Sequence, residues 1–368
     1  MTAPSAAPAL PATATPVLEA RSLVKHFPVR RTGRLTGRGT VVHAVDDVSI
    51  AVRQASITAV VGESGCGKST LTRMLARLIR PTSGELLLDG SPAARRAARE
   101  YAGVVQMVLQ DPFASLNPVH TVGYHLARPL RIHGLGPDGR SLDHEIASLL
   151  ERVALSRQSV DKYPHELSGG QRQRVAIARA LAVRPRVLLA DEPVSMLDVS
   201  IRLGVLNLLA DLRERERLAI VYVTHDIASA RYLGDEIAVM YAGQIIERGP
   251  AATVTDQPSH PYTQLLLAAA PDPDRPSPPA LQGRGAPPSL VTPPAGCRFH
   301  PRCPFAMAIC EQQAPPGIEV ASGHVSACWL HAQDADSTMP QNPGPGPGPI
   351  PPTTASQQDS RPPQGEST

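Results

Sequence analysis

The sequence predicts an α/β fold, in which a parallel sheet presents a binding site at the carboxyl ends of its strands. Short apolar runs that suit buried strands alternate with stretches of helical periodicity between residues 57 and 225. A glycine-rich segment, VGESGCGKST at 61–70, joins the first of these strands to a helix. A later apolar run ends in two consecutive acidic residues, Asp191 and Glu192. Together these observations predict a polar, glycine-rich site at one edge of a buried sheet.

The glycine-rich segment fits a phosphate-binding loop: a glycine, four residues, then glycine-lysine-serine. An apolar strand at 57–61 precedes it, and one helix face follows it, formed by Leu71, Met74, Leu75 and Leu78. The glycines let backbone N–H groups approach phosphates, Lys68 supplies a positive charge, and the Ser69 hydroxyl can bind Mg²⁺. The residues that we predict to bind nucleotide are Gly62, Glu63, Ser64, Gly65, Cys66, Gly67, Lys68, Ser69 and Thr70.

Two strands are expected before this loop. Residues 17–29 form the first, and the second contains Val48, Ile50 and Val52, whose alternation indicates a half-buried antiparallel strand. Between them lies an exposed basic loop with Arg30, Arg31, Arg34 and Arg38 among glycines. Such a cluster could contact anionic lipid or a partner, but its shortness favours a solvated hairpin loop.

The segments after the loop continue the alternation. Residues 85–90 read as a strand and turn, and the apolar run 104–109 is a strand that ends at Gln110. A helical pattern covers 113–166, and another helix begins at the segment Leu-Ser-Gly-Gly-Gln, residues 167–171. The series then continues with a strand at 187–190, a helix at 201–212 and a strand at 219–224. Strands connected through helices in this way are parallel, so their polar ends meet at one edge.

The polar ends supply the chemistry that ATP hydrolysis needs. Asp191 can hold Mg²⁺, directly or through water, and Glu192 can activate a water molecule as general base. Ser168 and the two glycines after it, at a helix start, form an anion-binding nest.

The order of these motifs resembles the nucleotide-binding subunit of an ATP-binding cassette (ABC) transporter. The phosphate loop, LSGGQ, ADEP, SMLD and THD follow one another in that family's order, over about residues 17–331. The resemblance implies a P-loop NTPase cassette at 17–257, with a RecA-like core, an antiparallel β subdomain and a helical subdomain at 113–167. It also implies ATP and Mg²⁺ as cofactors, with ATP-driven closure of a dimer in which the ATP is hydrolysed.

The resemblance assigns roles to further positions. Phe27 matches the aromatic residue that stacks on adenine, Gln110 the glutamine at Mg²⁺ or the lytic water, and His225 the histidine at the γ-phosphate. Glu192, His225 and Gln110 are then the catalytic residues, and Ser69 and Gln110 bind Mg²⁺. The signature that covers the partner's ATP is Leu167, Ser168, Gly169, Gly170 and Gln171, and the loop that crosses the dimer interface is Ser195, Met196, Leu197 and Asp198.

Two of these positions depart from the usual residues. Met196 stands where alanine is usual, and Cys66 where serine or alanine is common. Cys66 is either a redox switch, with its pKa lowered by Lys68 and backbone N–H groups, or simply a tolerated small side chain. The second interpretation is favoured.

Finer resemblance concerns the substrate and the partners. The segments 110–118, 163–174 and 191–195 resemble the oligopeptide/dipeptide importers, and the loop before Val41 resembles their F-type ATPase subunit. The implied partners are a D-type ATPase subunit, two transmembrane permease subunits and an extracytoplasmic substrate-binding protein. Nickel importers share much of the sequence of these segments, so an importer of nickel or another small solute is the alternative. A soluble non-transport ABC ATPase is a weaker alternative.

Composition limits the location and other partners. The formal charge of +3 is too small, and its residues too scattered, to predict a nucleic-acid partner. No apolar run reaches the roughly 18 residues of a membrane span, and the N-terminus lacks the pattern of a signal peptide. We therefore expect a peripheral protein on the cytoplasmic side of the cell membrane, with disordered segments at 1–16 and 332–368.

A C-terminal extension is expected at 258–331, and it contains Cys297, Cys303, Cys310 and Cys328. Their spacing fits neither the paired zinc knuckle nor the bacterial ferredoxin run. Four thiolates can hold a [4Fe–4S] cluster or Zn²⁺, and importers that the chain resembles here carry the cluster, so iron–sulfur is favoured over zinc and over free thiols. His300, His324 and His331 could replace a ligand, but we expect them on the surface.

Overall fold

A computed structural model describes residues 15–29, 40–135, 139–269 and 285–332, and all of these except Ala332 belong to one compact unit. The predicted basic residues Arg30, Arg31, Arg34 and Arg38 lie outside the described residues, as do segments 1–14 and 333–368, where disorder was predicted. None of the helices in the described ranges is long and apolar enough to cross a membrane.

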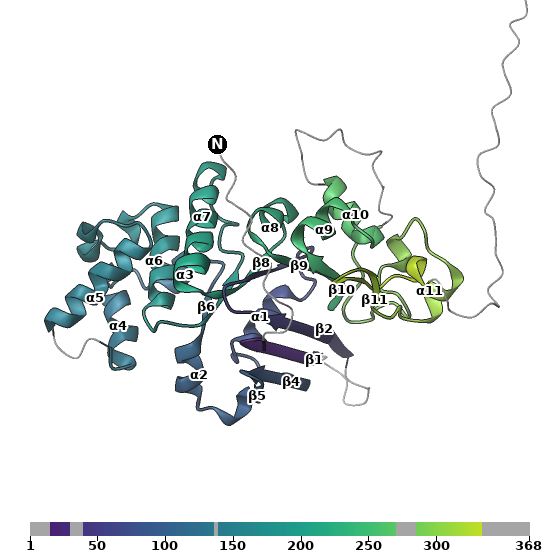
Figure 1. The fold of residues 1–368 in the computed structure, drawn as a ribbon, viewed down its shortest axis with the longest axis horizontal. Helices are drawn as coiled ribbons and strands as arrows, with labels where there is room; N and C mark the ends of the chain where they lie inside the picture. Colours follow the sequence, from purple (N-terminus) through teal and green to yellow (C-terminus); the bar gives the residue numbers. More distant parts are fainter. Residues whose placement is uncertain (1–14, 30–39, 136–138, 270–284, 333–368) are drawn as a thin grey trace, which may run out of the picture. The chain divides into compact units, whose positions relative to one another are not determined.

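The main sheet has eight strands in the order β11-β12-β10-β9-β3-β8-β7-β6 within the described part of the chain (Figure 1). Five neighbouring strands are parallel: β3 (Ile57–Val61), β6 (Val105–Val108), β7 (Val187–Asp191), β8 (Ala219–Thr224) and β9 (Glu236–Tyr241). Their carboxyl ends therefore lie at one edge, which confirms the predicted placement of Val61, Asp191 and Thr224.

Alternating side chains bury both faces of this sheet. In β3, Ile57, Ala59 and Val61 pack in one hydrophobic cluster, and Val60 packs in the other. The first cluster includes residues of α4 (Val122–Ile132), α5 (Gly139–Arg152), α6 (Gly169–Leu181), α7 (Val199–Glu216) and α8 (Ile227–Leu233). The second includes residues of α1 (Lys68–Leu75), α2 (Ala98–Val104) and the antiparallel sheet. The sheet is thus buried on both faces, as the apolar runs predict.

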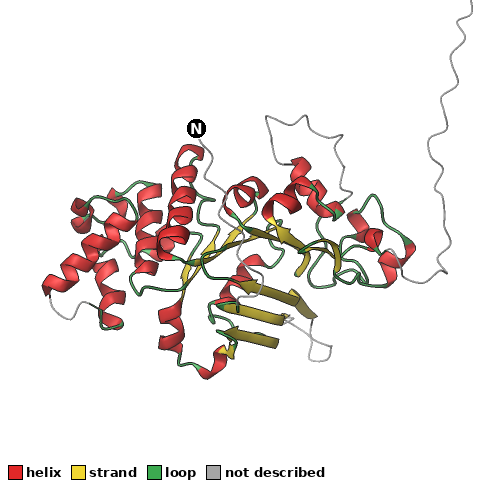
Figure 2. Cartoon of the chain, in the orientation of Figure 1, coloured by secondary structure: helices red, strands yellow, loops and turns green. Residues whose placement is uncertain are grey.

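The N-terminal strands form a separate antiparallel sheet, as predicted (Figure 2). Its order is β2-β1-β4-β5, formed by β1 (Leu18–Val29), β2 (Thr40–Val52), β4 (Ser83–Leu88) and β5 (Ser91–Pro92). Val48, Ile50 and Val52 of β2 are buried, and Val29 pairs with Thr40 across the segment that was read as a hairpin loop.

The predicted helical region begins with α3 (Pro112–Ser115) and continues through α4 to α6, which contact one another beside the β6 edge of the sheet (Figure 1).

One detail of the prediction for the helix after the phosphate loop is wrong. Helix α1 ends at Leu75, and Leu78 is 66% exposed rather than buried. Arg77 adopts a left-handed conformation (φ 57°), so the chain leaves the helix before Leu78 can face the core.

The segment after β9 joins the C-terminal residues to the same sheet. Strand β10 (Gln244–Pro250) is antiparallel to β9 and pairs on its other side with β12 (His324–Ser326), which pairs with β11 (Ile318–Ala321). Helices α9 (Ala251–Asp256), α10 (Pro261–Ala269) and α11 (Ala308–Gln312) accompany these strands. The cysteine-bearing residues therefore continue the main sheet.

Candidate functional site

The phosphate loop connects β3 to α1 in a tight turn that only glycine fits at two positions. A Cβ at Gly62 would lie 2.1 Å from the Met240 carbonyl oxygen, and one at Gly67 would lie 2.1 Å from the Ala44 carbonyl oxygen. Gly67 also has φ 110°. These contacts fix the loop between β9 and β2, with Ser64 and Gly65 exposed and Thr70 half-buried.

Lys68 occupies the centre of this loop. Its side chain is buried, and Nζ donates to the carbonyl oxygens of Gly62 (2.8 Å) and Glu63 (2.9 Å). The ammonium group is thereby held where the loop encloses it, and phosphate oxygens could replace these carbonyl acceptors.

Ser69 and Asp191 meet at the end of β7. The Ser69 hydroxyl donates to Asp191 Oδ1 at 3.1 Å, although the two residues are 122 positions apart. Burial raises the pKa of Asp191, and the charge of Glu192 raises it further, whereas the bond from Ser69 lowers it. A buried carboxylate beside a hydroxyl is a donor set that suits Mg²⁺, and the cation would compensate the buried charge.

Glu192 lies between two of the predicted catalytic side chains. Its Oε2 accepts from Gln110 Nε2 at 3.0 Å and lies 3.4 Å from His225 Nδ1. Glu192 has φ 46°, a strained value that is held by a bond from its N–H to the Val223 carbonyl oxygen and by Ser195, which donates to the Glu192 carbonyl oxygen. Gln110, Glu192 and His225 are thus brought together next to Asp191.

Phe27 lies half-buried on β1, opposite Val42 of β2. Lys25 Nζ lies over its ring, 5.0 Å from the centroid. The ring is therefore accessible on a strand of the antiparallel sheet, and its predicted stacking on adenine remains a prediction.

The signature forms the N-terminus of α6. The Ser168 hydroxyl accepts from Gln171 N–H, and the Gln171 side chain accepts from Ser168 N–H at 3.0 Å, which makes a capping box. Leu167 is buried, while a Cβ at Gly170 would lie 2.4 Å from Ile201 Cγ2. Ser168 itself is exposed, so the predicted anion nest faces outward from the helical region.

The predicted interface loop lies directly beside this signature. A Cβ built at Gly169 would lie 3.4 Å from Leu197 Cδ2. Leu197 is buried, Asp198 is the N-cap position of α7, and Met196 and Val199 expose 59% and 79% of their surface. Met196 and the neighbouring Val199 therefore present apolar surface next to the exposed Ser168, and the role of residues 195–198 at a dimer interface remains a prediction.

The redox interpretation of Cys66 is not supported. The side chain is 6% exposed, and burial raises the pKa of its thiol, although Lys68 at 4.0 Å opposes the shift. A buried thiol with a raised pKa is a poor nucleophile, so Cys66 acts as a small packed side chain.

The C-terminal residues contact the phosphate loop directly, which the sequence did not predict. Both terminal nitrogens of Arg302 donate to the Glu63 carboxylate, each at 3.0 Å, and the Tyr262 hydroxyl accepts from Glu63 N–H at 2.9 Å. Tyr262, Tyr241 and Phe299 form a buried aromatic cluster behind these contacts. The one local signal of a cationic partner is that Glu63 places an acidic side chain within a phosphate-binding loop.

The four cysteines lie around this contact. Cys310 and Cys328 are buried, Cys297 and Cys303 are half-buried, and Cys297 N–H donates to the Cys310 carbonyl oxygen at 2.8 Å. Burial raises the pKa of both Cys297 and Cys328 to about 11, and neighbouring sulfurs raise both values further. Across the described residues, no three of these sulfurs lie within 4.8 Å of one another.

The three histidines near the cysteines bind other groups. His324 is buried rather than on the surface, and its Nε2 lies 2.7 Å from Glu247 Oε1. His300 Nδ1 lies 2.8 Å from the Cys297 carbonyl oxygen, and His331 Nε2 lies 2.7 Å from the Ser259 carbonyl oxygen. One ring nitrogen of each histidine is thus already bonded to another group.

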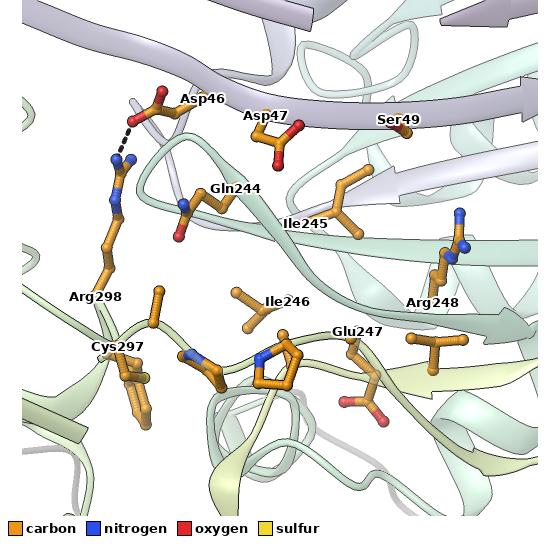
Figure 3. Close-up of a pocket in the computed structure, with 17 residues that line it drawn as sticks. Asp46, Asp47, Ser49, Gln244, Ile245, Ile246, Glu247, Arg248, Cys297 and Arg298 are labelled. Carbon is orange, nitrogen blue, oxygen red and sulfur yellow. Dashed lines mark hydrogen bonds and ion pairs between the residues drawn. The ribbon is translucent and has the colours of Figure 1, made fainter. Parts of the chain in front are cut away.

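A cavity of about 350 Å³ separates β2 and β10 from the C-terminal residues (Figure 3). Arg298 spans one end of it, where its guanidinium group binds the Asp46 carboxylate. Cys297 also lines the cavity, but no residue of the phosphate loop does. The side chains predicted to be catalytic lie instead at the carboxyl ends of the parallel strands.

Comparison with known proteins identifies two families. The family described as "ABC transporter" matches residues 45–195, and the "Oligopeptide/dipeptide transporter, C-terminal region" matches 246–310. The probable peptide ABC transporter ATP-binding protein y4tS of Sinorhizobium fredii is 44% identical over 325 residues, which cover 87% of this chain and 91% of that protein. The oligopeptide transport ATP-binding protein AppF of Bacillus subtilis is 40% identical, with 86% and 98% covered.

The fold is similar to solved ATP-binding cassettes. The dimeric cassette MJ0796, in a post-hydrolysis state bound to ADP and Pi, has a TM-score of 0.55 at 27% identity and covers 64% of this chain and 98% of its own. CbiO1 from Clostridium perfringens, part of the ABC transporter complex cbiONQ, has a TM-score of 0.57 at 26% identity, with 66% and 92% covered.

Proposed function

The chain belongs to the ABC transporter family as an ATPase subunit, and from this premise we propose that it powers peptide import across the cytoplasmic membrane. The observation that carries the proposal is that two features occur in one chain. The residues predicted to hydrolyse ATP lie together at the carboxyl ends of the parallel strands, and the chain also matches the oligopeptide/dipeptide C-terminal region. Relatives named as peptide, oligopeptide and di/tripeptide transport proteins support the substrate class.

The proposed site binds ATP through the phosphate loop. Lys68 and the loop N–H groups bind the phosphates, Phe27 stacks on adenine, and Ser69, Asp191 and Gln110 would hold Mg²⁺. The cation would neutralise charge that develops on the phosphate oxygens. Because Ser69 and Asp191 already bond each other at 3.1 Å, they form a donor pair that fits it.

Glu192 is the proposed general base. It accepts a proton from the attacking water while the bond between the terminal phosphorus and the ADP oxygen breaks, which leaves ADP and inorganic phosphate. Gln110 and His225 orient the Glu192 carboxylate and the water, because both contact Glu192 Oε2 in the resting arrangement.

The site is completed by a second ATPase subunit. Ser168 of the signature and Met196 of the interface loop are both exposed, and an ideal Cβ at Gly169 would lie 3.4 Å from the Leu197 side chain. The similar cassette MJ0796 was solved as a dimer. We therefore propose that this signature covers ATP in a partner of D type. The two ATPase subunits would bind peripherally to two transmembrane permeases, which work with an extracytoplasmic binding protein.

Purification of the tagged chain from detergent-solubilised membranes tests this assignment. We expect two membrane-spanning subunits and a second ATPase to co-purify, identified by mass spectrometry. After reconstitution with the binding protein, ATP should drive uptake of radiolabelled peptides and not of ⁶³Ni²⁺. Uptake of nickel alone would support the nickel alternative, and the absence of any membrane subunit would support a soluble ATPase.

The four cysteines are proposed to hold a [4Fe–4S] cluster. Burial raises the pKa of the Cys297, Cys303 and Cys328 thiols, so these three require a cationic group to be stable as thiolates. A tetrahedral zinc ion, with Zn–S bonds of about 2.3 Å, would bring all four sulfurs within about 3.8 Å of one another. The wider spacing in the described residues favours a larger group. Anaerobic purification should yield about four irons and four sulfides per chain, whereas one zinc without sulfide would contradict the cluster.

A further inference from the structure

We propose that Arg302 is a positioning residue for the phosphate-binding loop: it neutralises Glu63 and so allows the loop to bind the phosphates of ATP. This inference rests on the ATP-binding role above, and it concerns contacts made by the C-terminal residues. Glu63 and Arg302 are 239 positions apart, and their side chains form a two-bonded ion pair.

The first step is the place of Glu63. It directly follows Gly62, and its carbonyl oxygen accepts from Lys68 Nζ at 2.9 Å. The residue that carries this carboxylate therefore contacts the ammonium group that would bind a polyanion. Unneutralised, its negative charge would oppose the phosphates and compete for the positive field of Lys68.

The second step is the geometry of Arg302. Its two terminal nitrogens bind the two Glu63 oxygens at 3.0 Å each, the bidentate arrangement in which a guanidinium group neutralises a carboxylate most completely. The Arg302 side chain is 10% exposed, and its guanidinium carbon lies 5.8 Å from the Tyr241 ring centroid and 5.9 Å from that of Phe299. Because solvent screens this pair only weakly, the positive charge of Arg302 offsets the negative charge that Glu63 places on the loop.

The third step is that Glu63 is fixed in place. Its N–H donates to the fully buried Tyr262 hydroxyl, its carbonyl accepts from Lys68, and its carboxylate accepts from Arg302. Arg302 in turn belongs to a tight turn, in which its N–H donates to the Phe299 carbonyl oxygen and Cys303 N–H donates to that of His300. The turn between Cys297 and Cys303 thus presents the cation to the loop.

The test measures ATP affinity in a charge-based mutant cycle. In a Glu192→Gln background that stops hydrolysis, Arg302→Met should raise the Kd for MgATP on the order of tenfold, because it leaves the Glu63 charge unpaired. Glu63→Gln should bind at least as tightly as the parent. The double variant Arg302→Met/Glu63→Gln should return to within about twofold of the parent, and the defect of Arg302→Met should shrink in high salt.

A merely structural role for Arg302 gives a different result. The double variant would then bind as weakly as Arg302→Met, and that result would overturn the proposal. With Glu192 intact, Arg302→Met should raise KM for ATP and leave kcat within about twofold; a loss confined to kcat would also contradict it.

Folding and the premise are controlled separately. Circular dichroism and thermal unfolding verify each variant; should Arg302→Met not fold, Arg302→Lys is used. This variant loses the bidentate geometry but keeps the positive charge, so it should bind ATP within about threefold of the parent. A tenfold loss in a folded Arg302→Lys would refute the charge argument. Failure of the parent chain to bind ATP would instead refute the proposed function.

Discussion

Glu247 provides a sharp prediction about how the C-terminal residues are held to the cassette. This β10 residue is 1% exposed, and its carboxylate accepts three bonds: from Ser259 N–H (2.7 Å), His260 N–H (3.0 Å) and His324 Nε2 (2.7 Å). The three donors come from the start of α10 and from β12. One buried side chain therefore joins three segments, and we predict that Glu247→Ala loosens all of them.

The magnitude follows from these contacts. Hydrogen bonds to a charged acceptor contribute about 1.5–3 kcal/mol each, and the two backbone N–H groups would be left buried without an acceptor. Part of that loss is offset because the variant no longer desolvates a carboxylate. The expected net decrease in the free energy of unfolding is about 3–5 kcal/mol. Glu247→Gln, which keeps one acceptor oxygen, should lose about half as much.

Denaturant titration with two probes measures this effect. The only tryptophan, Trp329, donates to the Gln313 carbonyl oxygen at 3.0 Å and so reports on the C-terminal residues, whereas circular dichroism reports on the whole chain. In Glu247→Ala the fluorescence transition should move to lower denaturant than the circular dichroism transition. The exposed Glu151→Ala serves as the matched control and should change stability by less than about 0.5 kcal/mol. A decrease below about 1 kcal/mol for Glu247→Ala would refute this account.

Three further predictions concern the site and its pH dependence. Glu192→Gln should lower kcat by about 10²–10⁴-fold without weakening ATP binding, because the amide cannot accept the proton; phosphate release and equilibrium binding measure the two effects, and undiminished turnover would exclude Glu192 as the base. Burial lowers the pKa of His260 to about 3, and its Nδ1 accepts from Tyr262 N–H. The unfolded chain therefore binds one more proton than the folded chain below about pH 6.5, so stability should fall between about pH 6.5 and 3, at up to about 1.4 kcal/mol per pH unit. His260→Asn should flatten this dependence in unfolding titrations. An equally steep curve would show that another group titrates. Gly67→Ala should abolish ATP binding, since its Cβ would lie 2.1 Å from the Ala44 carbonyl oxygen, whereas Gly139→Ala, with open space around it, should bind normally; equal binding by both would contradict the packing argument.

The residues of the hydrolytic edge could be predicted because local pattern and motif order specify them. The apolar runs that became β3, β7 and β8 place the phosphate loop, Asp191 and His225 at strand ends, and parallel pairing then brings those ends together. The predicted face of α1 extended too far, because helical spacing alone does not reveal the left-handed Arg77 that ends the helix.

The contacts of the C-terminal residues could not be predicted in the same way. Glu63 contacts Tyr262 and Arg302, which lie 199 and 239 positions further along the chain and share no periodicity with it. Strands β11 and β12 are too short to show alternation, and buried His324 was expected on the surface because its partner Glu247 is specified only by tertiary packing. An acidic residue within a phosphate-binding loop was the one local signal of a missing cation.

The pairing of β12 with β10 has a consequence for any shortened form of the chain. Glu247 pairs with Ser326 and Arg248 with Val325 across this junction, and Ala327 N–H donates to the Ile246 carbonyl oxygen, so this part of β10 is covered on the side away from β9. Removal of residues after α10 would leave β10 as a bare edge strand, which can recruit strands from other molecules and promote aggregation. The C-terminal residues therefore also prevent β10 from pairing with strands of other molecules. A truncated cassette would need new charged side chains along β10 to remain monodisperse.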